Sequence, residues 1–221
     1  MGDDENPNAR VLALSDGVIA VAITLLVLDI RLPEGFGEFT DTQLWSALVA
    51  LWPRMLAYLL SFVVIGSFWF SHRAKFNHIV KTDGALMWIN LLFLLTVGLV
   101  PFTTNLIAES GGTLSTAIYA GTMVVSGLSL AWLWEHAIRN KLVDPALSKE
   151  DRTRQLTATL GVTAVFAVSV PLSVTHSDLA KYFWLLIIPV NFLLRAVAVQ
   201  RWKRDHPGEP VPRRKRPGDE T

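Results

Sequence analysis

The sequence predicts an all-α integral membrane protein with six transmembrane helices per subunit. Of its 221 residues, 51% are hydrophobic and 18% are charged, and the mean hydropathy is +0.38. The charged residues cluster between apolar runs that are long enough to cross a bilayer as helices. The chain contains no cysteine, which excludes disulfides, thiolate metal sites and cysteine nucleophiles.

Hydrophobic runs and the turn residues between them locate the helices. We expect spans over about residues 11–31, 44–70, 84–105, 113–135, 156–174 and 181–200. Together they form a transmembrane domain over residues 10–202, preceded by a short polar tail at residues 1–9. A short surface helix capped at Ser148 or Asp151 can precede the fifth span. Residues 203–221 are rich in proline, glycine and basic side chains, so we expect a disordered basic tail.

The distribution of basic residues predicts the orientation in the membrane. Six spans place both termini on one side, and that side carries 17 of the 20 Lys and Arg residues. The opposite side carries only Arg31, Arg54 and Lys181. Because short cytoplasmic segments are enriched in Lys and Arg, we expect both termini in the cytoplasm of a multi-pass cell-membrane protein.

The first span has two distinct faces. One narrow seam follows alternating steps of four and three residues, which is the spacing of close helix contact. Its members are Arg10, Leu14, Gly17, Val21, Thr24, Leu28 and Arg31. Asp16 lies on roughly the opposite face, together with Ala20, Ile23 and Val27. We therefore expect an apolar seam with one hydroxyl on one side and a buried acid on the other.

Two roles for Asp16 remain open, because acids inside membrane helices serve both structure and transport. The residue can anchor the helix through a salt bridge or hydrogen bonds, or it can take part in transport directly. It lies ~8 Å from the cytoplasmic end by helical rise, a depth that suits anchoring better than a proton relay. Its candidate partners are Trp69, His72, Arg73, Asp83 and Asn90.

Thr24 also has two interpretations. Its hydroxyl can bond back to its own helix, as is common in membranes, or it can form a ring of hydroxyls if several copies surround an axis. Val21, Leu25 and Leu28 then form apolar rings that gate by excluding water. The seam alone favours helix packing over pore lining.

Other motifs carry little weight. The run Thr96–Val100 is similar to a potassium filter, but it lies inside an apolar span and ends at Pro101, so a bent helix is the better interpretation. We find no catalytic grouping, metal site or phosphate loop, and expect no enzyme activity. We interpret the basic cluster Arg213–Arg216 as a solvated tail near anionic lipid. It is too weak a signal for nucleic-acid binding, so we expect no nucleic-acid partner.

Several motifs resemble one known family. Arg10, Ser15 and Asp16, followed by Gly17, Ala20, Thr24 and Leu25, resemble the first-helix signature of the transmembrane protein 175 family. Later elements agree, namely Tyr58, Ser61-Phe62, Trp69 with His72, Asp83, Asn90 and Pro101-Phe102. Leu14 stands where the family usually has Phe. The resemblance covers the first three spans well and the last three mainly by hydropathy and length.

The resemblance implies a homotetrameric cation channel, permeable to potassium ions over sodium, without a filter loop or cofactor. The first helix lines the pore in that family. Its apolar constriction falls on Val21, Leu25 and Leu28 here, and its selectivity layer on Thr24. The structural network that braces the helix falls on Arg10, Ser15, Asp16, Trp69, His72, Asp83 and Asn90. Membrane lipids are the other expected partners.

Two further functions are compatible with six spans and one buried acid. The first is a proton-linked secondary transporter or a proton-leak pathway that uses Asp16. The absence of an internal repeat or a broken helix pair argues against a transporter. The second is a membrane scaffold that conducts no ions.

Overall fold

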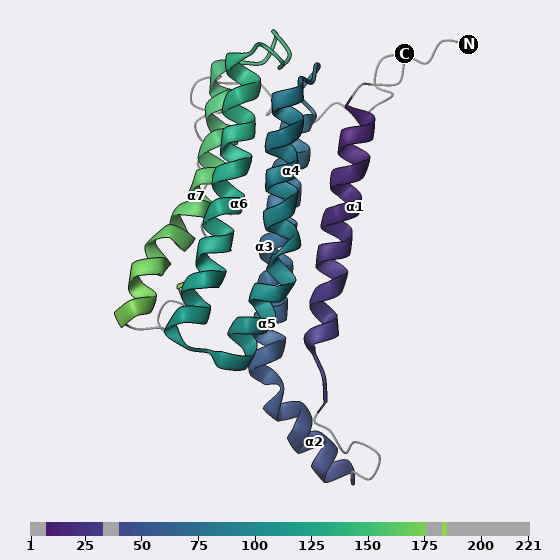
Figure 1. Cartoon of the computed structure of the whole chain (residues 1–221), viewed down its shortest axis with the longest axis vertical. Helices are drawn as coiled ribbons and strands as arrows, with labels where there is room; N and C mark the ends of the chain where they lie inside the picture. Colours follow the sequence, from purple (N-terminus) through teal and green to yellow (C-terminus); the bar gives the residue numbers. More distant parts are fainter. Residues whose placement is uncertain (1–7, 33–39, 176–182, 185–221) are drawn as a thin grey trace, which may run out of the picture.

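The computed structural model describes residues 8–32, 40–175 and 183–184, and within these ranges the protein is a bundle of helices (Figure 1). The elements are α1 (Ala9–Leu25), the 3-10 helix η1 (Leu26–Asp29), α2 (Asp41–Ala50), α3 (Trp52–Phe76), α4 (Gly84–Gly98), α5 (Val100–Ser110), α6 (Thr113–Arg139) and α7 (Lys149–Thr175). The all-α membrane fold is confirmed. Five spans long and apolar enough to cross a membrane lie in the described part.

Parts of the predicted layout fall outside the described residues. The sixth span, expected at 181–200, is represented only by Phe183 and Trp184. The tail at 203–221 and most of the tail at 1–9 also lie outside. The six-span topology and the domain boundaries therefore stay predictions.

The helices form a row in which α1 lies at one edge and α7 at the other (Figure 1). Only 22% of the apolar stretch of α1 is buried, compared with 56% of that of α6. The main core lies between α3, α4, α5 and α6, where Phe68, Phe93, Tyr119 and Met123 are buried. Because α1 is covered mainly by α3 and α4, one long side of this helix stays open within a single chain.

The second predicted span divides into two helices. The sequence predicted one helix at 44–70, whereas the structure has α2 and α3, which meet at Leu51. Pro53 explains the break, because its nitrogen carries no hydrogen for the carbonyl of Val49 and its ring crowds that carbonyl. Thr40 and Gln43 form a capping box that starts α2. In the view of Figure 1, α2 projects beyond the ends of α5 and α6.

Three other boundaries differ from the prediction. Helix α3 continues to Phe76 and takes in Ser71–Lys75, a segment that we predicted as loop. The third span continues to Ser110 and is interrupted at Leu99, two residues before Pro101, so the run Thr96–Val100 is helical apart from that residue. The surface helix predicted near Ser148 is continuous with the fifth span as α7. The hydroxyl of Ser148 accepts the backbone hydrogen of Asp151 at the start of α7 (3.0 Å).

Helices α6 and α7 pack closely against each other at Gly127. A Cβ atom at Gly127 would lie 2.0 Å from Oγ1 of Thr163, so only glycine fits at this position of α6. Small residues let membrane helices approach until their backbones are nearly in contact. This contact holds α7 against the outer side of the bundle, far from α1.

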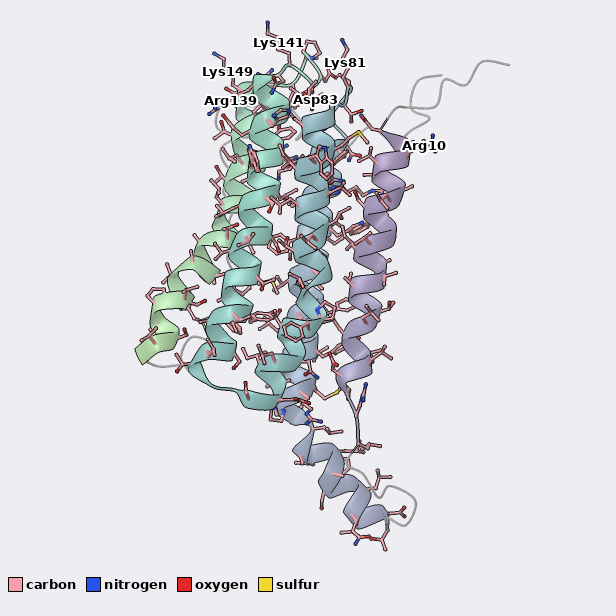
Figure 2. All side chains as sticks on the ribbon, viewed as in Figure 1. Arg10, Lys81, Asp83, Arg139, Lys141 and Lys149 are labelled. Carbon is pink, nitrogen blue, oxygen red and sulfur yellow. The ribbon has the colours of Figure 1, made fainter. Side chains whose placement is uncertain are left out.

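The loops at one end of the bundle are joined to each other and to α1. Backbone hydrogen bonds connect the α3–α4 loop to the α6–α7 loop, from Val80 to Leu142 (2.9 Å) and from Asp144 to His78 (2.9 Å). The side chain of Asn8, just before α1, donates to the carbonyl of Ile79. Charged residues gather at this end (Figure 2), among them Arg10, Lys81, Arg139, Lys141 and Lys149.

Candidate functional site

Helix α1 presents two stripes of side chains that lie on different sides. The bundle-facing stripe consists of Ser15, Ile19, Ala22 and Leu26, all buried. The exposed stripe follows the predicted seam through Leu14, Val21 and Leu28, with Val21 56% and Leu28 58% exposed. Leu25, which flanks the seam, is also exposed. In a membrane protein, an apolar side chain exposed within one chain faces either lipid or another subunit. The seam is therefore available for contact outside the chain.

The predicted bundle-facing face of α1 was wrong by about a quarter turn. We placed Ala20, Ile23 and Val27 on one face with the buried Asp16. Ile23 is partly buried against the core, but Ala20 is exposed and Val27 is 48% exposed. The buried stripe passes through Ser15 instead. Asp16 lies beside this stripe, and its side chain is 34% exposed. The long side chains of Trp69 and Arg73 can reach the carboxylate without enclosing it.

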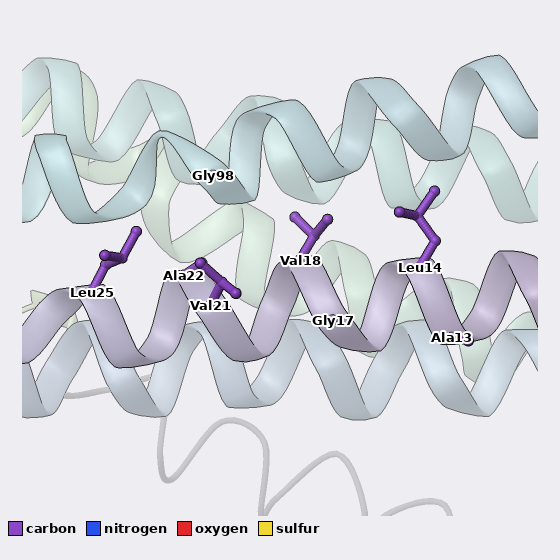
Figure 3. A pocket seen from close by; sticks show the side chains of 8 residues that line it. All are labelled: Ala13, Leu14, Gly17, Val18, Val21, Ala22, Leu25 and Gly98. Carbon is purple, nitrogen blue, oxygen red and sulfur yellow. The ribbon is translucent and has the colours of Figure 1, made fainter.

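A shallow apolar groove runs along the seam (Figure 3). Helix α1 supplies most of its walls, and Gly98, at the end of α4, closes one side. The lining residues are Ala13, Leu14, Gly17, Val18, Val21, Ala22, Leu25 and Gly98. A Cβ atom on Gly17 or on Gly98 would meet nothing within 4 Å. Both glycines thus leave open space rather than permit a contact inside the chain.

The hydroxyl of Thr24 lies on the exposed side of α1. It donates to the carbonyl of Val21 in the previous turn (2.8 Å). This is the local bond expected of a threonine in a membrane helix. The bond uses the hydrogen of the hydroxyl and leaves lone pairs on its oxygen. The exposed oxygen can therefore still coordinate a cation.

The predicted first helix ends earlier than residue 31, because η1 continues α1 as a 3-10 helix. Side chains three residues apart eclipse each other in a 3-10 helix. Leu25 and Leu28, at the junction and inside η1, are both exposed. The tighter winding brings these two side chains toward one line at the end of the seam. Leu26, on the other side, stays buried in the core.

A buried hydrogen-bond network fixes α1 from behind the seam. The amide nitrogen of Asn90 donates to Oγ of Ser15 (3.0 Å), and the amide oxygen of Asn90 lies 2.9 Å from Nε2 of His72. The His72 ring is stacked between Phe76 and Phe93, with centroids 4.4 and 5.4 Å away. Because all three polar side chains are fully buried, each bond replaces an otherwise costly unpaired group. The network joins α1, α3 and α4.

A second network holds Asp16. Nε1 of Trp69 donates to one carboxylate oxygen (2.7 Å), and the Arg73 guanidinium donates to the other (3.2 Å). The guanidinium also lies over the indole ring, 5.7 Å from its centroid. Two of the five candidate partners of Asp16 therefore contact it, both from α3. This geometry occupies both oxygens of the carboxylate with donors, as an anchor requires.

Two residues of the predicted structural network lie apart from the others. Arg10 is exposed at the start of α1. Asp83 caps α4 by accepting the backbone hydrogen of Leu86 (2.7 Å), and its carboxylate also lies 3.0 Å from Nε2 of His136. These bonds hold the pKa of Asp83 below its ordinary value, the Leu86 hydrogen bond being the largest cause. Asp83 thus joins α4 to α6 and not to α1.

Lys75 is a buried cation that we assigned to a loop. Its ammonium donates to Ser71 (2.9 Å), to the carbonyl of Gln155 (3.1 Å) and to the hydroxyl of Thr159. These bonds link α3 to α7 on the side away from α1. A sequence signal could have placed Lys75 in the helix, because it continues the helical spacing of the buried face of α3. That face contains Ser61, Val64, Phe68, His72 and Lys75.

A buried hydroxyl cluster was also missed. Oγ of Ser61 lies 2.8 Å from the hydroxyl of Thr104 and 3.0 Å from that of Tyr119. The three residues come from α3, α5 and α6 and are buried. Their sequence separations of 43 and 58 residues gave no local signal. The cluster connects the central helices that support α1.

The fold and these networks define a helical, multi-span membrane protein in which one edge helix is fixed by polar contacts and leaves an apolar stripe open. Comparison with known proteins narrows the class. Residues 10–101 match the family model described as endosomal/lysosomal potassium channel TMEM175. The match covers the helices that hold both networks.

Relatives extend the match over most of the chain. A potassium channel from Streptomyces collinus is 38% identical over 199 residues, which are 84% of this chain and 95% of that protein. The crystal structure of a lysosomal potassium-selective channel TMEM175 homologue from Chamaesiphon minutus superposes with a TM-score of 0.69 at 30% identity, covering 88% of this chain and 97% of that one. The human endosomal/lysosomal proton channel TMEM175 is 42% identical over 97 residues, 19% of its length. The chain belongs to the TMEM175 family.

Proposed function

We propose that this protein is a potassium channel whose pore is lined by α1 helices from several copies of the chain. The observation that carries the proposal is the exposed seam of α1, which is held in place from behind by two polar networks. Family membership and the potassium-channel relative of similar length support potassium as the ion that permeates. The chain carries out transport and no enzymatic reaction.

The pore requires an assembly, because one α1 helix cannot enclose a path. A homotetramer places four copies of the seam around one axis. Val21, Leu25 and Leu28 then form apolar collars, and the groove at Gly17 and Gly98 has room for a neighbouring chain. Neither glycine carries a side chain that would keep a partner at a distance. Subunits therefore meet along α1, the least buried of the five described membrane spans.

Conduction in this assembly is passive. Potassium ions cross an apolar neck, which excludes water when it is narrow and thereby closes the path. The Thr24 oxygens supply lone pairs between the Val21 and Leu28 collars and partly replace the hydration of the ion. A potassium ion holds its hydration water less tightly than a sodium ion does. The Thr24 layer therefore favours potassium over sodium.

The orientation follows from charge. The end of the bundle with Arg10, Lys81, Arg139, Lys141 and Lys149 faces the cytoplasm (Figure 2). Both termini lie on that side if the sixth span, at 181–200, crosses the membrane. The protein then resides in the cell membrane as a multi-pass protein.

The alternative function, proton transport through Asp16, is less compatible with the contacts of that residue. Trp69 and Arg73 occupy both carboxylate oxygens of Asp16 with hydrogen-bond donors. A proton carrier needs an acid that exchanges its proton during transport. The human relative carries the name of a proton channel, so proton flux is measured beside potassium flux.

The test is flux from liposomes that contain the purified protein. A potassium gradient with a potential-sensitive dye reports potassium flux, and a pH-sensitive dye inside the vesicle reports protons. We expect potassium-driven flux that does not saturate and needs no counter-ion gradient. Saturating flux that requires a proton gradient, or vesicles that stay silent at every pH and voltage, contradicts the proposal. Native mass measurement in detergent reports the number of subunits.

A further inference from the structure

Helix α2 presents an apolar face that nothing in the described part of the chain covers. Trp45 is 69% exposed and Trp52, the first residue of α3, is 59% exposed. Leu48 and Val49 lie between them on the same side of the helix and are also exposed. No residue of α2 is buried in its own chain. These four residues, Trp45, Leu48, Val49 and Trp52, are called the α2 face.

The position of α2 argues against the lipid core as its cover. Helix α3 alone has 25 residues and is ~37 Å long, which exceeds the ~30 Å hydrocarbon core of a bilayer. Since α2 precedes α3 and projects past the ends of α5 and α6 (Figure 1), it lies beyond that core. An apolar face there would meet water unless protein covers it.

The charges of α2 argue against a helix that lies on the membrane surface. Interfacial helices carry Lys and Arg on their polar side, where they meet anionic headgroups. The polar side of α2 consists of Gln43 and Ser46. Thr42 and the one charged residue of the helix, Asp41, lie one turn before Trp45 on the side of the α2 face. The helix contains no basic residue. A protein surface is a better match for two tryptophans, which are enriched at subunit contacts.

We infer that the α2 face is a docking surface for a second copy of this chain, which adds a contact between neighbouring subunits at the end of the bundle opposite Arg10. The inference rests on the proposed assembly around α1. Helix α2 lies on the α1 side of the bundle in Figure 1, the side on which copies meet in that assembly. The contact continues the interface beyond the membrane and rings the mouth of the pore.

Photo-crosslinking tests this surface directly. The probe p-benzoyl-phenylalanine replaces Trp45 in one variant and Ala50 in the control, because Ala50 is exposed on the opposite side of the same helix. We expect covalent dimers on a denaturing gel from the Trp45 position, at several-fold higher yield than from the Ala50 position. Both variants should fold, since no residue of α2 is buried.

Three outcomes overturn the inference. The first is equal dimer yield from both positions. The second is labelling of lipid, or of residues within the same chain, from the Trp45 position. In both cases a multimeric native mass of the unmodified protein leaves the proposed channel intact. The third is a monomeric native mass, which removes the proposed assembly together with the α2 contact.

A second variant measures the strength of the contact. Trp45→Ser removes the largest side chain of the α2 face, and Ser46→Ala is the matched control on the polar side. We expect Trp45→Ser to lower the temperature at which the assembly dissociates to monomers, with helix content by circular dichroism unchanged. Equal dissociation temperatures for both variants would overturn the docking surface.

Discussion

The indole of Trp69 donates its hydrogen to the Asp16 carboxylate over 2.7 Å, so that α3 holds α1 by its flank. Arg73, one turn further along α3, donates to the other oxygen of the same carboxylate. The apolar seam of α1 faces away from these contacts. In the proposed channel, the role of Asp16 is therefore to fix the orientation of α1 rather than to contact ions.

Substitution of Asp16 separates its charge from its hydrogen bonds. An amide in Asp16→Asn still accepts from Trp69, whereas Asp16→Ala leaves Trp69 and Arg73 without an acceptor. We expect Asp16→Ala to cost about 1–2 kcal/mol of unfolding free energy and Asp16→Asn less, because the site is partly solvated. Unfolding in detergent measures both. Asp29→Asn, on the same span, should be neutral, and a loss as large as that of Asp16→Ala would contradict the anchor.

Thr24 controls ion discrimination in this account. Thr24→Ala removes the oxygen layer and should lower the potassium-to-sodium permeability ratio by up to roughly tenfold, which corresponds to about 1.4 kcal/mol. Thr24→Ser keeps the oxygen and should retain most of the ratio. Bi-ionic potentials across a planar bilayer give the ratios. Unchanged ratios in Thr24→Ala would remove the hydroxyl layer from the mechanism.

Gly127 leaves no room for a side chain between α6 and α7. A methyl group there overlaps Thr163, so Gly127→Ala should lower stability by about 1–3 kcal/mol. Gly121→Ala is the matched control, because a Cβ atom at Gly121 meets nothing within 4 Å. Thermal unfolding in detergent compares the two. The clash predicts partial rescue by Thr163→Gly in the Gly127→Ala background, and a harmless Gly127→Ala variant would refute the close crossing.

Asp83 makes the stability of α4 depend on pH. Its pKa in the folded protein is lowered from 3.8, chiefly by the Leu86 hydrogen bond and then by His136. A lowered folded pKa adds stability that is present well above pH 3.8 and is lost as pH falls through the folded value. Wild type should therefore lose more stability between pH 6 and pH 3 than Asp83→Asn, which keeps the cap but cannot titrate. The control Glu109→Gln should lose as much stability over this pH range as the wild type. If Asp83→Asn also loses as much as the wild type, the lowered pKa of Asp83 is contradicted.

The sequence predicted the membrane fold and the apolar seam of α1 because both are periodic patterns within one segment. Val21 and Leu28 recur at helical spacing, so their common side could be inferred without any partner. The contact of Asp16 with Trp69 and Arg73 could only be narrowed to a set of candidates, since 53 and 57 residues separate them. The family resemblance placed Ser15, Asn90 and His72 in one network. No local pattern shows its bonds, in which Asn90 joins Ser15 to His72.

Three features were predicted incorrectly, namely the burial of Lys75, the break at Leu51 and the position of the buried stripe of α1. Lys75 was placed in a loop on account of its charge, yet three donors satisfied by Ser71, Gln155 and Thr159 make burial acceptable. The break at Leu51 follows from Pro53, which we had placed inside one continuous helix. The tilt of the buried stripe of α1 toward Ser15 depends on where Asn90 lies. The burial of Lys75 and the tilt of the stripe depend on tertiary contacts that the pattern along one helix does not contain, whereas the break at Leu51 follows from a local effect of proline.

The central claim is that the seam of α1 lines the ion path, and thiol modification of single cysteines tests it most directly. The chain has no native cysteine, so Val21→Cys, Leu28→Cys and the control Val27→Cys each introduce one reactive group. All three positions are about half exposed in a single chain, but Val27 lies off the seam. The account predicts that a charged thiol reagent blocks potassium flux through the Val21→Cys and Leu28→Cys channels and leaves Val27→Cys conducting. Block at Val27→Cys with full conduction in the other two would contradict it.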